Sequence, residues 1–207
     1  MVNVLLVEDS RVTRDMVERH IDQSDEYRLI GTLENAANAE IVCTRGKVDL
    51  VLMDVCTADD ESGLEAAARI KKRNPGIRII IMTSMPEHSF IEKAKAAGCD
   101  SFWYKEYGDV ELDEVMSRTI AGESVYPDET PMLIIGDAVS TEFTEREYAV
   151  LRQLAHGYKY DEIAQNMGIS TNTVKFHIKG LLSKTGYHST LQLVVDVVNK
   201  NLVLPGY

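Results

Sequence analysis

Side chains that could bind a metal ion and a phosphoryl group follow four apolar runs in the first part of the sequence. In chain order they are Glu8, Asp9, Asp54, Thr83 and Lys105. Three carboxylates packed together repel one another unless a cation neutralises them, and Mg²⁺ prefers such oxygen ligands. A carboxylate beside such a metal can attack phosphorus, while an ammonium and a hydroxyl group bind the phosphoryl oxygens. These residue types therefore indicate aspartyl-phosphate chemistry, provided that the fold brings them together.

The four runs, with a weaker fifth, predict a parallel β-sheet. They are almost continuously apolar, as strands buried on both faces are, and segments with helical periodicity separate them. The runs are Val2–Val7, Tyr27–Leu33, Val48–Met53, Ile77–Met82 and Cys99–Tyr104, and the helical segments are Arg11–His20, Asn35–Thr44, Gly63–Arg73, Glu87–Ala97 and Asp109–Ile120. We expect a doubly wound α/β domain with a five-stranded, flavodoxin-like sheet of order 2-1-3-4-5. In that order the first and third strands are neighbours, so their acidic ends meet where the strand order reverses.

The first 121 residues resemble the receiver domain of two-component response regulators. The matching residues are Glu8-Asp9, Asp54 at the end of Leu50-Val51-Leu52-Met53, Thr83-Ser84 and Phe102-x-x-Lys105. The resemblance implies that Asp54 accepts phosphate from a sensor histidine kinase. It also implies that Mg²⁺ is bound by Glu8, Asp9, Asp54 and the backbone carbonyl of Cys56. By the same pattern Thr83 and Lys105 bind the phosphoryl group, and Thr83 and Phe102 form the switch.

The loop after Asp54 departs from the family pattern. The family usually has Met-Pro here and a glycine eight positions after the phosphoacceptor. In this chain Gly63 comes nine positions after Asp54, proline is absent, and Asp59, Asp60 and Glu61 are consecutive acids. The departure motivates an alternative, a pseudo-receiver transcription factor that phosphorylation does not control.

After Val139 the pattern changes from strands to helices. Four helices are predicted, at Thr144–His156, Tyr160–Met167, Thr171–Lys184 and Ser189–Asn199. Gly168 fits a tight turn before the third helix, and Ser170 or Thr171 can cap that helix. Val174 and Ile178 belong to its buried stripe, whereas Lys175 and Lys179 point elsewhere. A helix with a basic, hydroxyl-bearing face suits the major groove of DNA.

This tail resembles the LuxR-type helix-turn-helix of the NarL/FixJ regulators. The matching segments are Phe143-Thr144-x-Arg146-Glu147, Ala155-x-Gly157 and Thr173-Val174-Lys175-x-His177. The resemblance implies that Lys175, Phe176 and Lys179 face DNA bases or phosphates, and we expect Thr171 and Thr173 to join them. The last helix carries a stripe of Leu191, Val194, Val195 and Val198, which serves partly in the core and is open to a role in a dimer contact.

The distribution of charge changes at the point where the sequence pattern changes from strands to helices. Residues 1–139 include 15 basic and 27 acidic residues, whereas the remainder includes seven and six. We expect a receiver at 1–121, a linker at 122–139 with glycine, proline and little periodicity, and an all-α helix-turn-helix domain at 140–207.

Several other classes of protein are disfavoured. No apolar run approaches the roughly 18 residues of a membrane span, and the N-terminus lacks the pattern of a secretory signal. Three widely spaced cysteines fit a reducing cytoplasm. Neither G-x-G-x-x-G nor a P-loop is present, and Cys56 stands where an aspartate-nucleophile phosphatase needs a second Asp. We therefore expect a regulator rather than an enzyme, one that binds double-stranded promoter DNA and forms a homodimer when phosphorylated.

Overall fold

Five parallel strands form the central sheet of the computed structural model, which describes residues 1–107 and 110–203. The strands are β1 (Val2–Val7), β2 (Tyr27–Leu33), β3 (Leu50–Asp54), β6 (Arg78–Thr83) and β7 (Ser101–Tyr104). They lie in the order β2-β1-β3-β6-β7. Because β6 and β7 are the fourth and fifth strands of this sheet along the chain, the predicted order 2-1-3-4-5 is confirmed.

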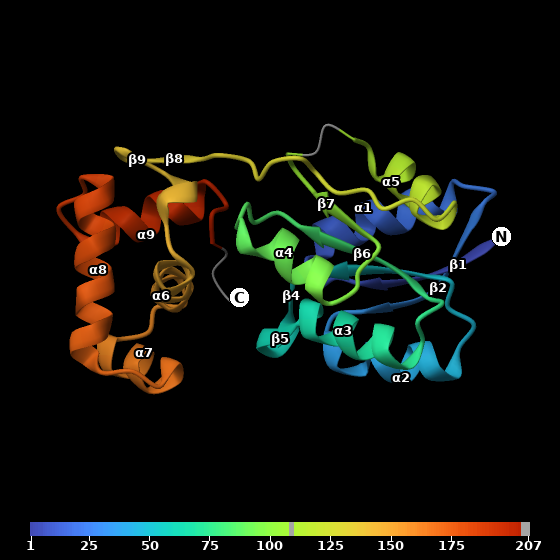
Figure 1. Ribbon diagram of the computed structural model, residues 1–207, viewed down its shortest axis with the longest axis horizontal. Coiled ribbons are helices and arrows are strands. Elements are labelled where there is room, and N and C mark those ends of the chain that lie inside the picture. Colours follow the sequence, from blue (N-terminus) through green and yellow to red (C-terminus); the bar gives the residue numbers. More distant parts are fainter. Residues whose placement is uncertain (108–109, 204–207) are drawn as a thin grey trace. The chain divides into compact units, whose positions relative to one another are not determined.

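Helices cover both faces of this sheet. The helices α1 (Arg11–Asp22) and α5 (Leu112–Ile120) lie on one face, and α2 (Ala39–Arg45) and α3 (Gly63–Arg73) lie on the other (Figure 1). Side chains from α1 and α5 pack against β1, β3 and β6 in one buried cluster. Trp103 of β7 belongs to this cluster, and its indole N–H donates to the carbonyl of Val110 at 2.9 Å.

Three helix starts in the first unit differ from the prediction, and one of them is the helix expected from Asn35, which begins at Ala39 as α2. The helix expected at Glu87–Ala97 is α4 (Ser89–Ala96), and α5 begins at Leu112. Asp109, where we expected the latter helix to begin, lies outside the described residues.

The loop after β3 folds into a small hairpin. Strands β4 (Cys56–Thr57) and β5 (Glu61–Ser62) pair across the 3-10 turn η2 (Ala58–Asp60). Asp59 takes a positive φ of 62° in this turn. A second 3-10 turn, η1 (Ala36–Asn38), follows β2, and its cap Asn35 donates to the carbonyl of Ala58 at 2.8 Å. The additional residue of this loop is therefore accommodated by a turn that is bonded to the loop after β2.

The chain divides into two compact units. One comprises Met1–Ser84 with Phe90–Glu129, and the other comprises Met85–Ser89 with Thr130–Tyr207. The segment 122–139, which we expected to be a linker, carries structure at both ends. Val125 is buried in the core of the first unit, and β8 (Ile134–Ile135) pairs with β9 (Ala138–Val139) beside the core of the second.

The second unit is helical, as predicted. After the 3-10 turn η3 (Ser140–Glu142) come α6 (Glu145–Ala155), α7 (Tyr160–Met167), α8 (Thr171–Thr185) and α9 (Thr190–Asn199). Gly168 ends α7 with a positive φ of 62°, and Ser170 caps α8 through the backbone N–H of Thr173. Residues 204–207, the expected end of this domain, lie outside the described residues.

The apolar stripe of α9 is only partly in the core. Leu193 and Val197 are the fully buried residues of this helix, and Val194 and Val198 pack at the edge of the core. Leu191 and Val195 are 72% and 50% exposed.

Within residues 1–107 and 110–203, no helix combines the length and the apolar character that crossing a membrane requires.

Candidate functional site

The ends of four neighbouring strands bring the predicted receiver residues to one edge of the sheet. Val7 of β1 pairs with Met53 of β3, so Glu8 and Asp9 come next to Asp54. On the other side of β3, Asp54 pairs with Met82, the residue before Thr83. The backbone N–H of Lys105 then donates to the carbonyl of Thr83 at 2.9 Å. The site therefore forms because parallel strands end at the same edge.

Lys105 joins Glu8 and Asp54, the two buried acids of this cluster. Its Nζ lies 2.6 Å from Oε2 of Glu8 and 2.8 Å from Oδ2 of Asp54. The side chain of Glu8 is fully buried, and those of Lys105 and Asp54 are 7% and 11% exposed. These bonds fix the orientation of both carboxyl groups, since charge-assisted hydrogen bonds of this length are strong in a buried setting.

Burial and mutual repulsion disfavour the ionised acids. Burial, followed by repulsion from Asp54, raises the pKa of Glu8 to about 7. Burial also raises the pKa of Asp54, although the ammonium of Lys105 opposes this effect. Burial alone would lower the pKa of Lys105, but the carboxylates of Asp54 and Glu8 outweigh it, and this pKa is raised. The cluster thus holds more negative charge than one ammonium group neutralises.

The carboxyl groups of the cluster fit a magnesium ion. Glu8, Asp9 and Asp54 each offer an oxygen atom, and these atoms lie within 4.8 Å of one another. Opposite ligands of Mg²⁺ stand about 4 Å apart, so small side-chain rotations bring the three oxygens into range. A divalent cation would also relieve the repulsion that raises the pKa values of Glu8 and Asp54.

The remaining predicted receiver residues lie nearby in the fold. Thr83 is 1% exposed at the end of β6. Phe102 is also 1% exposed, and its ring centroid lies 5.0 Å from that of Tyr104 in an edge-to-face arrangement. Cys56 begins β4 and is half-buried, two residues after Asp54.

Two residues that support the acidic cluster were not predicted from the sequence. The backbone N–H of Ser10 donates to Oε1 of Glu8 at 3.1 Å. Arg14 donates to the carbonyl of Glu8 at 3.2 Å and pairs with Glu34 at 2.9 Å. Helical spacing places Arg14 one turn after Ser10, but nothing in the sequence distinguishes it from other surface arginines.

Gly63 also belongs to the support of the cluster. A Cβ atom on Gly63 would lie 1.8 Å from the carbonyl oxygen of Asp54 and 3.0 Å from Cγ of Met53. The backbone of α3 thus touches the end of β3 at a position that only glycine fits. Gly63, which stands one position later than in the family pattern, therefore allows α3 to pack closely against Asp54.

In the second unit, one face of α8 is open to solvent. Lys175, Phe176 and Lys179 are exposed, and Phe176 exposes 72% of its surface. Val174 and Ile178 are buried on the opposite face. Asn172 and Ser183 are exposed as well, which extends this face by one turn in each direction. Helical spacing from Phe176 would have found Asn172.

Thr171 and Thr173 differ from the other predicted DNA-binding residues. Both are half-buried. The hydroxyl of Thr171 donates to Oδ1 of Asp161 at 2.8 Å, and the hydroxyl of Thr173 lies 2.8 Å from that of Ser170. Their hydroxyl groups therefore help to join α7 to α8 and to cap α8.

The two units match two described families. Residues 4–117 match the response regulator receiver domain, and residues 141–197 match the luxR family of bacterial regulatory proteins. The chain belongs to the two-component response regulators that carry a LuxR-type DNA-binding domain.

Individual relatives agree with this class, and solved structures agree with the fold. The response regulator protein VraR of Staphylococcus aureus is 30% identical over 209 residues, which cover 98% of this chain and 99% of the relative. The VraR of Staphylococcus epidermidis is 29% identical over the same shares of both chains. A LuxR-family response regulator from Aurantimonas has a TM-score of 0.57 at 24% identity, covering 63% of this chain and 91% of its own.

RcsB from Salmonella enterica serovar Typhimurium, solved bound to a promoter with the phosphomimetic BeF₃⁻, is similar in fold. Its TM-score is 0.56 at 17% identity, and the match covers 95% of this chain and 97% of that chain.

Proposed function

We propose that this response regulator is phosphorylated on Asp54 by a sensor histidine kinase with Mg²⁺, and that phosphorylation controls its sequence-specific binding to promoter DNA. One observation carries the proposal. Glu8, Asp9 and Asp54 converge at the point where strand order reverses, with Lys105 bonded to two of them. Structural ion pairs rarely gather three acids around a single buried lysine, because the excess charge is costly to bury.

The residues of the cluster suit in-line phosphoryl transfer. A carboxylate oxygen of Asp54 attacks phosphorus, and the bond from phosphorus to the imidazole nitrogen of the kinase's phosphohistidine breaks. Lys105 orients the carboxylate and neutralises phosphoryl oxygens, while Thr83 donates its hydroxyl to one of them. Glu8, Asp9, Asp54 and the carbonyl of Cys56 would hold Mg²⁺, which supplies positive charge to the phosphoryl oxygens when bound.

Phosphotransfer from acetyl phosphate tests this proposal. The full chain is incubated with acetyl phosphate and Mg²⁺, and its intact mass is measured. We expect the mass of one phosphoryl group to be added, and we expect Asp54→Asn or EDTA to abolish the addition. Labelling that persists in Asp54→Asn would contradict the assignment of the phosphoacceptor. A chain that folds but takes up no phosphoryl group would support the pseudo-receiver alternative.

The open face of α8 is proposed as the DNA reader. Its two lysines, Lys175 and Lys179, stand one turn apart with Phe176 between them, on the side of the helix that the core does not use. Lysine side chains bind phosphates or guanine edges, and an aromatic ring can contact a thymine methyl group. Thr171 and Thr173 stay proposed contacts at the start of this helix, and their hydrogen bonds show that they also help to position α8.

The salt dependence of DNA binding tests this reader. The probe is a duplex selected by the full chain from a random-sequence pool. Each phosphate contact that is lost should reduce the slope of log K against log salt by about 0.9. Lys175→Ala/Lys179→Ala should therefore flatten the slope. Lys47→Ala/Lys72→Ala removes the same charge from exposed positions of the first unit and should leave the slope unchanged. Equal slopes for both double variants would exclude α8 as the reader.

Two copies of the chain are proposed to bind paired half-sites when phosphorylated. The second domain carries a net charge near zero, so one copy should bind DNA weakly. Leu191 and Val195 provide exposed apolar surface on α9 for this dimer. Sedimentation of the phosphorylated chain and of a Leu191→Asp/Val195→Asp variant tests the assembly. An unchanged dimer in the variant would exclude this face.

A further inference from the structure

The chain between α5 and the second unit is held on the edge strand of the sheet. The backbone N–H of Phe102 in β7 donates to the carbonyl of Val125 at 2.8 Å. The backbone N–H of Val125 donates in turn to Oγ of Ser101 at 3.0 Å, and Oγ of Ser101 lies 2.6 Å from Oγ1 of Thr119. The side chain of Val125 is 8% exposed in the core. Residues 123–126, here called the strap, therefore occupy the open side of β7.

Tyr126 ends the strap and lies against Phe102. The two ring centroids are 6.5 Å apart with an interplanar angle of 27°. The hydroxyl of Tyr126 donates to the carbonyl of Cys99 at 2.8 Å, and Nζ of Lys95 lies 5.4 Å from its ring centroid. Burial raises the pKa of the Tyr126 phenol above its ordinary range, so the hydroxyl keeps the proton that it donates.

Phe102 is thus attached to the strap in two ways. Its backbone N–H binds Val125, and its ring contacts Tyr126, while Tyr104 packs edge-to-face against the same ring. Any reorientation of the Phe102 ring changes the contact with Tyr126. An aromatic pair contributes about 0.5–1.5 kcal/mol beyond its buried area, which corresponds to a factor of about 2 to 12 in an opening equilibrium.

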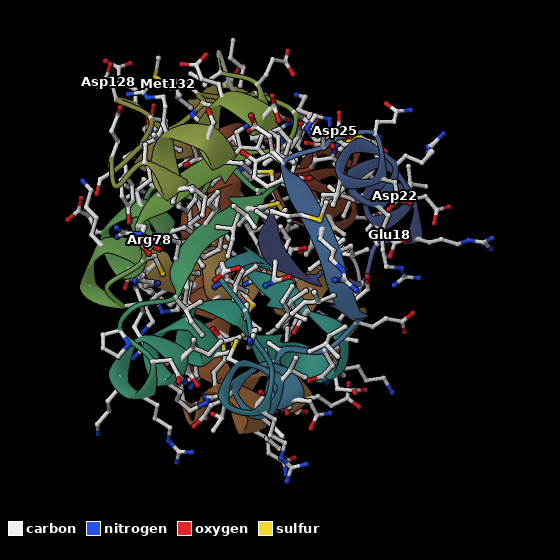
Figure 2. All side chains as sticks on the ribbon, turned by 90° about the vertical axis from the view of Figure 1, so that its right-hand side faces the viewer. Glu18, Asp22, Asp25, Arg78, Asp128 and Met132 are labelled. Carbon is white, nitrogen blue, oxygen red and sulfur yellow. The ribbon has the colours of Figure 1, made fainter. Side chains whose placement is uncertain are left out.

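We propose that the strap couples the position of the Phe102 side chain to the conformational freedom of the residues that follow the strap. This inference rests on the proposed function and takes Thr83 and Phe102 as the switch pair that the sequence pattern implies. Movement of Thr83 toward the phosphoryl group lets the Phe102 ring turn, the contact with Tyr126 is lost, and the strap opens more often. The residues that follow, among them the exposed Asp128 and Met132 labelled in Figure 2, then gain freedom.

Amide hydrogen exchange of the full chain tests the coupling without DNA. The amide of Phe102 reports its bond to Val125, and the amide of Val125 reports its bond to Ser101. With acetyl phosphate and Mg²⁺, both amides should exchange about 2- to 12-fold faster. Intact mass of the same sample measures the phosphoryl content. A phosphorylated chain with unchanged exchange at both amides would overturn the proposal.

Variants test the coupling independently of phosphorylation. Phe102→Leu should accelerate exchange of Val125 by the same factor without any phosphoryl donor. Phe90→Leu is the matched control, because it removes another buried ring of the first unit, 5% exposed on α4. In Tyr126→Leu the amides of Phe102 and Val125 should exchange fast, and phosphorylation should no longer change their rates. In Tyr126→Phe phosphorylation should still accelerate the exchange of both amides. Equal exchange in the Phe102→Leu and Phe90→Leu variants would overturn the coupling, whereas failure to add a phosphoryl group would contradict only the proposed function.

Discussion

Replacing Gly63 by alanine should damage the acidic cluster without touching any of its side chains. The new Cβ would stand 1.8 Å from the carbonyl oxygen of Asp54, where real contacts are not shorter than 3.0 Å. The start of α3 and the end of β3 must therefore separate by more than about 1 Å. Both are backbone segments, so no side-chain rotation relieves the overlap.

Two effects of Gly63→Ala follow from this displacement. Overpacking of a well-filled region costs about 1–3 kcal/mol of unfolding free energy. A displacement of about 1 Å at a reacting group can slow a reaction about 100-fold, and Asp54 is the residue displaced. We expect both a lower urea midpoint and a much slower gain of phosphoryl mass from acetyl phosphate.

Gly76→Ala is the matched control for this prediction. No atom lies within 4 Å of the Cβ that it would add, and Gly76 does not have a positive φ. This variant should be neutral or stabilised by about 0.4–1 kcal/mol, because alanine restricts the unfolded chain. If Gly63→Ala and Gly76→Ala unfolded alike, the close approach of α3 to Asp54 would not constrain the site. The unfolding comparison decides this even in a chain that takes up no phosphoryl group.

Two further predictions concern groups outside the acidic cluster. Burial raises the pKa of Glu147, but hydrogen bonds from Lys184 and from the capped start of α6 outweigh it and hold the pKa below the ordinary 4.5. Glu147→Gln should therefore lower the free energy of unfolding by about 1–3 kcal/mol near neutral pH. In urea unfolding this difference from the unchanged chain should disappear as the pH falls below about 4.5. A difference that does not change with pH would refute the pairing. Burial raises the pKa of Cys43 to about 11 and that of Cys99 to about 12. Iodoacetamide should therefore label the half-buried Cys56 first in the native chain. Equal rates of labelling at all three thiols would contradict this prediction.

The sheet and the acidic cluster could be predicted because the burial of strands produces a recognisable pattern of apolar residues in the sequence. Strands covered on both faces are continuous apolar runs, and parallel strands bring the residues after each run to a common edge. Glu8, Asp54 and Lys105 could therefore be placed together without knowledge of any distance. The bonds of Lys105 to both acids could not be predicted, since they depend on side-chain rotamers.

The strap and the two small hairpins have no comparable pattern in the sequence that would predict them. Val125 is a single aliphatic residue in this segment, and its anchors are the backbone N–H of Phe102 and the hydroxyl of Ser101, both inside a strand. Two-residue strands such as β4 and β8 are too short to show periodicity. Helical spacing indicates which face of a helix a residue lies on but not its partner, so the hydrogen bond from Thr171 to Asp161 of the preceding helix could not be predicted.

The position of the single tryptophan gives this chain an intrinsic optical probe. Trp103 is the only tryptophan in the sequence, and it lies in β7 between Phe102 and Tyr104. Its fluorescence therefore reports on the first unit alone, whereas far-ultraviolet circular dichroism reports on the helices of both units. Unfolding curves that differ between the two signals would show that the units melt separately, and curves that coincide would show that they melt together. A change in Trp103 emission on adding acetyl phosphate would follow repacking one residue from Phe102, in the unlabelled protein and in real time.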